Sequence, residues 1–127
     1  MGYRWDLADH LTGITYPDGR EISYGRNGVG QIGSVQSSDG IPAVTLAGTI
    51  SHAPFGGPSG WQFWNQQSVS VGRDPKYRIT RLQSSQTPAG AVAQDLTLTY
   101  NTANLVTVIT DNTAALSESF GYDKLYR

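Results

Sequence analysis

The stretch Arg73–Leu82, RDPKYRITRL, decides how this chain is interpreted, because its pattern returns along the sequence. An aromatic residue or an arginine, here named the opening residue, comes first, and an aspartate or asparagine follows it directly. A basic or amide residue stands five places after the opening residue, and aliphatic residues stand six and nine places after it. Repetition of this kind predicts stacked copies of one supersecondary unit.

The pattern returns in several copies, whose residues are predicted to have structural duties. Three copies are complete, another has its aliphatic residues one place early, and the last contains only the first residues of the pattern. The motif residues are Trp5, Asp6, Leu11 and Ile14; then Asn27, Ile32 and Val35, opened by Arg26; then Asp74, Ile79 and Leu82; then Tyr100, Asn101, Leu105 and Val108; and finally Tyr122 and Asp123.

The aspartate or asparagine and the aliphatic residues of the motif each have a physical explanation. An aspartate or asparagine oxygen at the start of a tight connection can accept a hydrogen bond from a backbone N–H two residues later. The paired aliphatic residues are expected to form a stripe along one face of a sheet, where each fully buried side chain contributes about 1.5–3 kcal/mol.

Turn residues and alternating apolar residues predict strands without helices between them. Pro17-Asp18-Gly19 separates two alternating runs and therefore predicts a β-hairpin. Leu96, Leu98 and Tyr100 are expected on one strand face. Residues 51–60 are rich in proline and glycine and are expected to be irregular, and residues 89–95 and 112–116 are expected to be hairpin loops. The predicted fold class is all-β, with antiparallel β-hairpin repeats.

The composition limits the number of domains and the kinds of partner that this chain can have. The chain of 127 residues fits a single domain, residues 1–127, and could bury about two-thirds of its unfolded surface. Nine basic and ten acidic residues give a net charge of −1, so nucleic acid and anionic membrane surfaces are not expected partners. No apolar run approaches the ~20 residues that a membrane span needs.

No motif for catalysis or for a cofactor stands out. The sequence has no cysteine, which excludes disulfides and thiolate zinc sites, and its two histidines lack metal-site spacing. No Gly-x-Ser-x-Gly elbow presents a serine to His10 or His52. His10 is expected to have a structural role and His52 to be a solvated loop residue. We therefore predict a protein that is not an enzyme, with no metal and no cofactor.

Two other groups of residues could carry a site. The aromatic cluster Trp61, Phe63 and Trp64 could line a ligand groove, although packing of two of the three is the simpler interpretation. Trp61 and Phe63 are expected on one face and Trp64 on the other. Five arginines are expected in local ion pairs with neighbouring carboxylates rather than in an anion site, and these are Arg20, Arg26, Arg73, Arg78 and Arg81.

The repeats resemble the RHS or YD-repeat proteins of bacteria. In that family the unit reads approximately Tyr-Asp-x-x-Gly-Arg-Leu, and Tyr122–Arg127 matches it except at Tyr126. Trp5–Leu11 is similar to a second copy. The Pro54-Phe55-Gly56 turn before Trp61–Asn65 is similar to a stretch found in such proteins.

The resemblance implies a container. Family members form a twisted, ribbon-like sheet that spirals into a shell around a toxic C-terminal domain, so the chain is expected to be a segment of a longer array in a secreted or cell-surface polymorphic toxin. The expected partners are the remainder of the shell and the enclosed toxin. Homo-oligomers through open sheet edges are also expected. Self-cleavage is not assigned to Asp74-Pro75.

The alternative hypothesis is a surface-associated module that binds carbohydrate or protein through the Trp61 region. An enzyme ranks third. A toxin shell should be followed by a core region and a variable effector, whereas an adhesive array should lead to a wall or membrane anchor.

Overall fold

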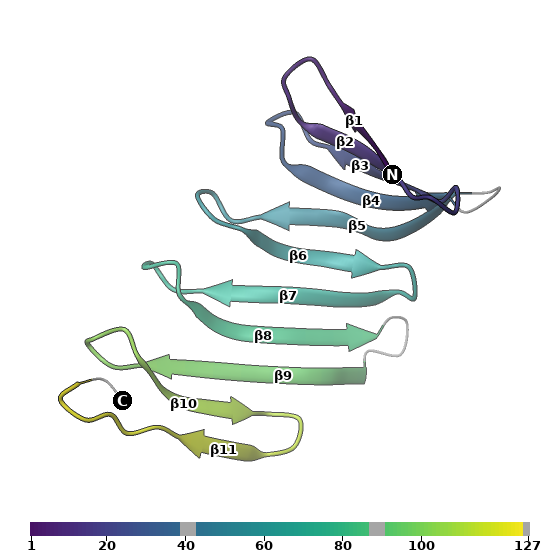
Figure 1. Ribbon diagram of the computed structural model, residues 1–127. Coiled ribbons are helices and arrows are strands. Elements are labelled where there is room, and N and C mark those ends of the chain that lie inside the picture. The colour runs from purple at the N-terminus through teal and green to yellow at the C-terminus, as the bar shows by residue number, and fades with distance from the viewer. Residues whose placement is uncertain (39–42, 87–90, 126–127) are drawn as a thin grey trace. The chain divides into compact units, whose positions relative to one another are not determined.

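The computed structural model describes residues 1–38, 43–86 and 91–125, which form strands and turns (Figure 1). No helix occurs among these residues. The strands are β1 (Gly2–Trp5), β2 (Leu11–Thr15), β3 (Glu21–Arg26), β4 (Ile32–Ser38), β5 (Val44–His52), β6 (Pro58–Phe63), β7 (Gln67–Arg73), β8 (Ile79–Gln86), β9 (Ala91–Tyr100), β10 (Val106–Asp111) and β11 (Leu116–Ser119).

Strand order in the sheet follows the sequence from β1 to β11. Every pair with a defined register is antiparallel and joins consecutive strands. Short hairpin connections produce this order, because consecutive antiparallel strands need only a tight turn between them. The predicted all-β, antiparallel architecture is confirmed. Within the described residues no helix has the length and apolar character that a membrane crossing demands.

The chain divides into two compact units, Met1–Gln67 and Ser68–Arg127, which are described separately. Unit 1 holds β1 to β6 and unit 2 holds β8 to β11, with the division at the start of β7. The single domain proposed for residues 1–127 stays a prediction.

Local turn chemistry explains the hairpin between β2 and β3. The backbone N–H of Tyr16 donates to the carbonyl of Arg20 at 2.8 Å, and that of Gly19 donates to the Tyr16 carbonyl at 3.0 Å. Gly19 has a φ of 87°, a conformation that costs glycine little. The turn predicted at Pro17-Asp18-Gly19 is confirmed.

Two loop predictions were wrong. Residues 51–60 are not irregular, because β5 continues to His52 and β6 begins at Pro58. Pro58 is the first residue of its strand, a position where a missing N–H is tolerated. Ala91–Asp95 belongs to β9, where pairing with β8 overrides its weak strand propensity, whereas residues 87–90 lie outside the described part. The loop expected at residues 112–116 is confirmed for residues 112–115, and Leu116 begins β11.

A β-bulge follows the repeat turns at Trp5, Arg26 and Tyr100, and it puts both aliphatic positions on one face. Trp5 pairs with Leu11 and Tyr3 with Ile14, so the register skips Thr12. Paired residues share a face, and Trp5 and Tyr3 are two apart on β1. Leu11 and Ile14 therefore lie on one face although they are three residues apart.

The two faces of each unit differ in polarity. In unit 1, Tyr3, Ile14 and Ile22 are cross-strand partners on an apolar face. On the other face Arg4 donates to Glu21 at 3.3 Å. In unit 2 the apolar cross-strand pairs are Leu82 with Leu96 and Leu98 with Ile109. Its polar face carries the hydrogen-bonded pairs Arg81–Asp95 and Asn112–Thr97 and the hydroxyl pair Thr110–Ser117. The division predicted for Leu96 and Leu98 against Thr97 is confirmed by this register.

The expected fully buried stripe is absent, because no hydrophobic residue is buried among the described residues. Leu11, Ile14, Ile32 and Val35 are half-buried, and Ile79 is 36 % exposed. The physical reason is that the described strands of each unit form one layer of sheet, with no second described layer against its apolar face.

Candidate structural site in the repeat turns

Each repeat turn is capped by the aspartate or asparagine that follows the opening residue. Asp6 Oδ1 accepts hydrogen bonds from the backbone N–H groups of Ala8 and His10, both at 2.9 Å. The same two contacts recur at 2.9–3.1 Å from Val29 and Gln31 to Asn27, from Lys76 and Arg78 to Asp74, and from Ala103 and Leu105 to Asn101. Asp123 accepts from the Leu125 N–H at 2.7 Å. Each of these side chains thus accepts the hydrogen bond that the sequence predicts, from the N–H two residues later.

The backbone of these turns is also the same. The Asp6 N–H donates to the His10 carbonyl at 3.0 Å, and the Asp9 N–H donates to the Asp6 carbonyl at 3.2 Å. This is a type I turn followed by one left-handed residue, a common three-residue hairpin. The left-handed residues are Asp9, Gly30, Tyr77 and Asn104, with φ values of 57°, 80°, 62° and 65°.

The Tyr100 copy has the same length as the others. Asn101 Oδ1 caps the Leu105 N–H as Asp74 Oδ1 caps the Arg78 N–H, so Leu105 occupies the basic or amide position. Val106 pairs with Tyr100 and Ile109 with Leu98, which puts Val106 and Ile109 at the aliphatic positions. Val108 pairs with Thr99 on the opposite face. The one-residue shift inferred from the sequence for Leu105 and Val108 is therefore corrected.

The opening side chain connects its hairpin to the preceding copy. The Tyr122 hydroxyl donates to the Val106 carbonyl at 2.7 Å, and the Tyr100 hydroxyl donates to the Ile79 carbonyl at 2.6 Å. Arg26 donates to the Leu11 carbonyl at 3.1 Å. In all three cases the acceptor is the sixth residue after the opening residue of the preceding copy. We call this contact the hairpin staple, and it explains why a long side chain with a terminal donor opens the repeat.

A second lateral contact runs from one turn to the next. Arg78 binds Asp74 within its own turn at 2.6 Å and donates to Asn104 Oδ1 of the next turn at 2.9 Å. Its guanidinium also lies 4.4 Å from the centre of the Tyr100 ring. His10 holds the equivalent place in unit 1, where a Cβ on Gly30 would lie 3.5 Å from its ring. The structural role expected for His10 is consistent with this contact and with its 3.1 Å approach to Asp6.

The structure contains another repeat copy that sequence reasoning missed. His52 stands at the opening position, and the Ala53 N–H donates to the Gly57 carbonyl at 3.2 Å, as in the other turns. His52 pairs with Pro58 and Ser51 with Gly60, which is the bulge of the other copies. Because Ala53 has no side-chain oxygen, only the spacing of residues around the turn could have identified this copy in the sequence. His52 is thus the half-buried last residue of β5, not a loop residue, and its Nδ1 has no partner in the described part.

Hydrogen bonds lower the pKa values of the exposed turn carboxylates. At Asp6 the backbone N–H of His10 is the main cause of the lowered pKa. At Asp18 the backbone N–H of Arg20 is the main cause, and the Arg20 side chain adds to it. Both carboxyl groups therefore stay ionised to lower pH than an ordinary aspartate.

The two aspartates of unit 2 that bind arginine also have lowered pKa values. Burial raises the pKa of Asp74, but hydrogen bonds from the side chain and backbone of Arg78 outweigh it. At Asp95, which is 7 % exposed, the Arg81 guanidinium is the main cause of the lowered pKa. Two hydrogen bonds of 2.8 and 2.6 Å join these side chains as a bidentate pair.

The arginine prediction holds for three side chains. Arg20, Arg78 and Arg81 form the predicted ion pairs, with Asp18, Asp74 and Asp95. Arg26 and Arg73 instead donate to backbone carbonyls, those of Gly30 at 2.6 Å and Tyr77 at 3.4 Å. The guanidinium groups of these two opening residues thus provide donors for carbonyl oxygens of their own turns.

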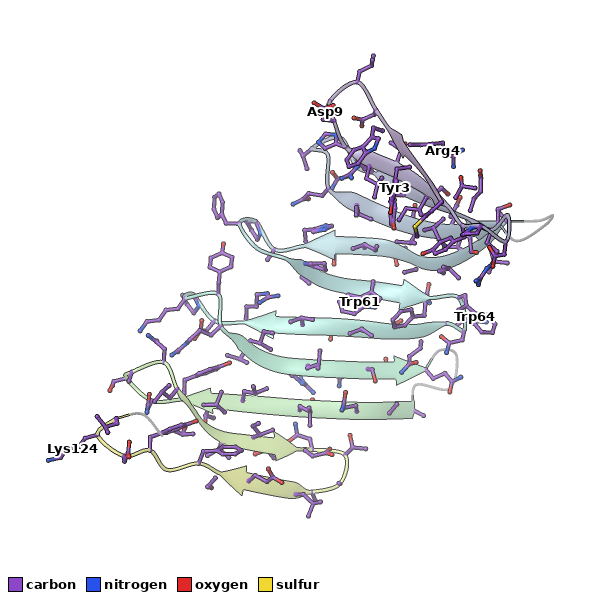
Figure 2. All side chains as sticks on the ribbon, viewed as in Figure 1. Tyr3, Arg4, Asp9, Trp61, Trp64 and Lys124 are labelled. Carbon is purple, nitrogen blue, oxygen red and sulfur yellow. The ribbon has the colours of Figure 1, made fainter. Side chains whose placement is uncertain are left out.

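The aromatic residues of β6 separate into a packed pair and an exposed ring. Trp61 and Phe63 meet edge to face with ring centres 6.2 Å apart, as their expected common face requires. Trp64 is 70 % exposed beside the turn after β6 (Figure 2). Trp64 and Phe63 line an open hollow of about 460 Å³ with Val44, Thr45, Gly48, Thr49, Gln62 and Gln66.

Among the described residues, no group of three or more histidine, aspartate or glutamate side chains could hold a metal ion. His10 contacts Asp6, and His52 lies at the end of β5. These positions bring no serine, histidine and aspartate together as a triad.

Comparison with known proteins identifies the fold. No family model and no curated protein matches the sequence. The crystal structure of TcdB2-TccC3 without its hypervariable C-terminal region matches with a TM-score of 0.92 at 17 % identity, over 98 % of this chain and 6 % of that chain. The Photorhabdus luminescens Tc holotoxin pore matches with a TM-score of 0.92 at 16 % identity, over 98 % and 6 %.

The chain has the fold of the matched part of these TcdB2-TccC3 and Tc holotoxin structures. The resemblance to RHS/YD-repeat proteins is therefore confirmed at the level of the fold. The chain spans about 6 % of the length of the chains it matches.

Proposed function

We propose that this chain is a non-catalytic wall segment of an RHS-type bacterial toxin shell that encloses a toxic effector domain. The observation that carries the proposal is the match of nearly the whole chain to one part of the Tc toxin shell. We infer a secreted or cell-surface location as part of a larger protein.

The repeat geometry supports a wall. Five repeat turns are capped by their own aspartate or asparagine, and hairpin staples tie Arg26, Tyr100 and Tyr122 to the copy before them. The turn caps and the hairpin staples therefore hold the described hairpins in place through contacts within one layer of sheet. A single layer with one polar and one apolar face can separate water from an enclosed surface of different polarity.

The partners in this proposal are the remaining strands of the shell. β1 and β11 are the outermost strands of the sheet, and each has one edge without a neighbouring strand among the described residues. Free edges pair readily with another strand. In the isolated chain the same edges would pair two copies.

A chimeric shell tests the proposal. Residues 3–125 would replace the matching strands of the TcdB2-TccC3 shell, and electron microscopy would show whether the shell closes. A closed shell that protects its interior domain from protease is the expected result. A matched chimera with Asn101→Ala and Tyr100→Phe should close less efficiently. An open shell containing a correctly folded insert would contradict the proposal.

The hollow beside Trp64 supports a second candidate, a surface module that binds neutral carbohydrate. An exposed indole offers a stacking face, and Gln62, Thr45 and Thr49 supply uncharged polar groups beside it. Thr49 has a φ of 50°, a rare conformation for a β-branched residue, at the register shift between Gly48 and Ser51.

Tryptophan fluorescence titrated with soluble polysaccharides tests this candidate. Trp64→Ala should abolish a saturable change, and Trp5→Ala, which removes another exposed indole, should leave it intact. A titration without any saturable change in the wild-type chain would reject the candidate.

A further inference from the structure

The turn between β3 and β4 contains an asparagine followed by a glycine, Asn27-Gly28, and this pair occurs nowhere else in the sequence. An asparagine side chain can react with the backbone nitrogen of the next residue, because the two close a five-membered ring. Glycine offers the least steric resistance in that second place, since it has no Cβ. Both residues are exposed, and a Cβ added to Gly28 would meet no atom within 4 Å. Water and base therefore reach this pair.

The backbone nitrogen of Gly28 is free to react. Its N–H has no hydrogen-bond partner in the described part of the chain. The next three N–H groups, those of Val29, Gly30 and Gln31, all donate to Asn27. A backbone amide must lose its proton before it attacks a carbonyl carbon, and an exposed N–H without a partner loses that proton more readily than a bonded one.

The cap of this turn also prepares the Asn27 side chain for attack. Oδ1 of Asn27 accepts from the Val29 N–H at 3.1 Å and from the Gln31 N–H at 3.0 Å. When a nitrogen attacks Cγ, negative charge develops on Oδ1. Two fixed backbone donors stabilise such a charge, as they do in an oxyanion hole. The hydrogen bonds that hold the turn therefore also favour the reaction.

Two other turns each lack one of these features. Asn101 has the same two caps, at 2.9 and 3.0 Å, but Thr102 follows it, and a side chain branched at Cβ crowds the attacking nitrogen. Asp18 is followed by Gly19, but the Gly19 N–H donates to a carbonyl of its own turn at 3.0 Å. The lowered pKa of Asp18 also keeps its carboxylate charged, and a charged carboxylate repels a nucleophile. Only Asn27 combines the cap, the amide and a following glycine with a free N–H among the described residues.

We propose that Asn27 is a modification site, at which the folded chain undergoes spontaneous deamidation. Base removes the Gly28 N–H proton, the nitrogen forms a bond to Asn27 Cγ, and Nδ2 takes up a proton and leaves as ammonia. The product is a cyclic imide, which water opens. Attack of water at Cγ gives aspartate, and attack at the backbone carbonyl carbon of residue 27 gives isoaspartate. Water is the only co-reactant.

The two products affect the turn differently. Aspartate keeps the cap and adds one negative charge, because Asp6 and Asp74 already cap their turns from the same position. Isoaspartate adds a methylene to the main chain, and a three-residue hairpin turn with one left-handed residue does not accommodate that extra length. Deamidation therefore either converts an amide cap into a carboxylate cap or disrupts the hairpin of β3 and β4.

Peptide mapping by mass spectrometry tests this site. The folded full chain is incubated in mildly alkaline buffer, and conversion of amide to acid is followed at each asparagine. Asn27 should convert several times faster than Asn101. Gly28→Thr should reduce the rate at Asn27 to that at Asn101, and it fits the turn because Gly28 has no positive φ and open space at Cβ. Thr102→Gly should raise the rate at Asn101 toward that of Asn27.

Incubation in urea separates the effect of the fold from that of the sequence. Conversion of Asn27 in both the folded and the unfolded chain is the expected result. An Asn27 that reacts in urea but stays intact in the folded chain would overturn the proposal, because the turn would then protect the pair. Equal rates at Asn27 and Asn101 in the folded chain, or unchanged rates in the two variants, would also overturn it.

Discussion

The turn at Ala53–Gly57 and the turn at Asn101–Leu105 make the same two backbone hydrogen bonds with different side chains. Their two backbone hydrogen bonds measure 3.2 and 3.2 Å in the first turn and 2.9 and 3.1 Å in the second. Only the second has a side-chain oxygen that accepts from two N–H groups. Turn shape is therefore set by the backbone and by pairing of the flanking strands, and the cap adds stability to it.

Removing the cap from the second turn should have the largest effect. Asn101→Ala loses two hydrogen bonds, and we expect the free energy of unfolding to fall by about 1–3 kcal/mol. Urea denaturation followed by circular dichroism measures the change. Thr102→Ala, an exposed change in the same turn, should stay within about 0.5 kcal/mol of the wild type. Equal stability of Asn101→Ala and Thr102→Ala would show that the cap contributes nothing.

Removing the hairpin staple of the same copy should cost less. Tyr100→Phe deletes one hydrogen bond, that to the Ile79 carbonyl, and keeps the ring under Arg78. The expected loss is about 0.5–1.5 kcal/mol in the same urea experiment. Tyr24→Phe is the control, because Tyr24 lies inside β3 and does not open a repeat. A larger loss from Tyr24→Phe than from Tyr100→Phe would reject the staple.

Adding a cap to the first turn should stabilise the chain. In Ala53→Asn the new oxygen would face the N–H groups of Phe55 and Gly57, the positions that are capped elsewhere, and Asp74-Pro75 shows that a proline after the capping residue fits the turn. We expect a gain of about 0.5–1 kcal/mol. Ala53→Leu adds size without an acceptor and should give no gain. A destabilised Ala53→Asn chain would mean that the two turns differ in their backbone after all.

The same comparison explains what the sequence could and could not predict. Capped turns were predictable because aspartate and asparagine identify themselves by type, and the hairpin at Asp18 was equally clear. The His52 copy was missed because Ala53 removes the identifying oxygen while the strands preserve the geometry. The Tyr100 copy was misaligned because Leu105 is aliphatic at a position where other copies have a basic or amide residue.

Burial could not be predicted from the pattern of aliphatic residues alone. Leu11 and Ile14 mark an apolar face correctly, and the bulge at Thr12 explains their unusual spacing. Whether a second layer covers that face depends on residues far away in sequence or in another chain. The spacing of apolar residues within one strand contains no information about that layer. Full burial was therefore predicted for aliphatic side chains that are half-buried in the structure.

Lowering the pH should destabilise turns that are capped by a carboxylate but not turns that are capped by an amide. This is the smallest of the expected effects. The pKa of Asp74 is lowered in the folded chain, so its contribution to stability is present above its ordinary value of 3.8 and is lost as pH falls through the lower folded value. Asn101 caps its turn without titrating. Stability should therefore fall on acidification through the Asp74 turn and not through the Asn101 turn.

The Asp74→Asn variant isolates this titration, because the amide can keep the two backbone caps but cannot form the ion pair with Arg78. At neutral pH the variant should be less stable than the wild type, and the difference should shrink as pH is lowered below 3.8, where the wild-type carboxyl becomes neutral. Urea midpoints of both chains between neutral and acid pH measure it. A difference that stays constant over this range would mean that the ion pair adds nothing to the cap, and that the carboxylate and amide turns are equivalent.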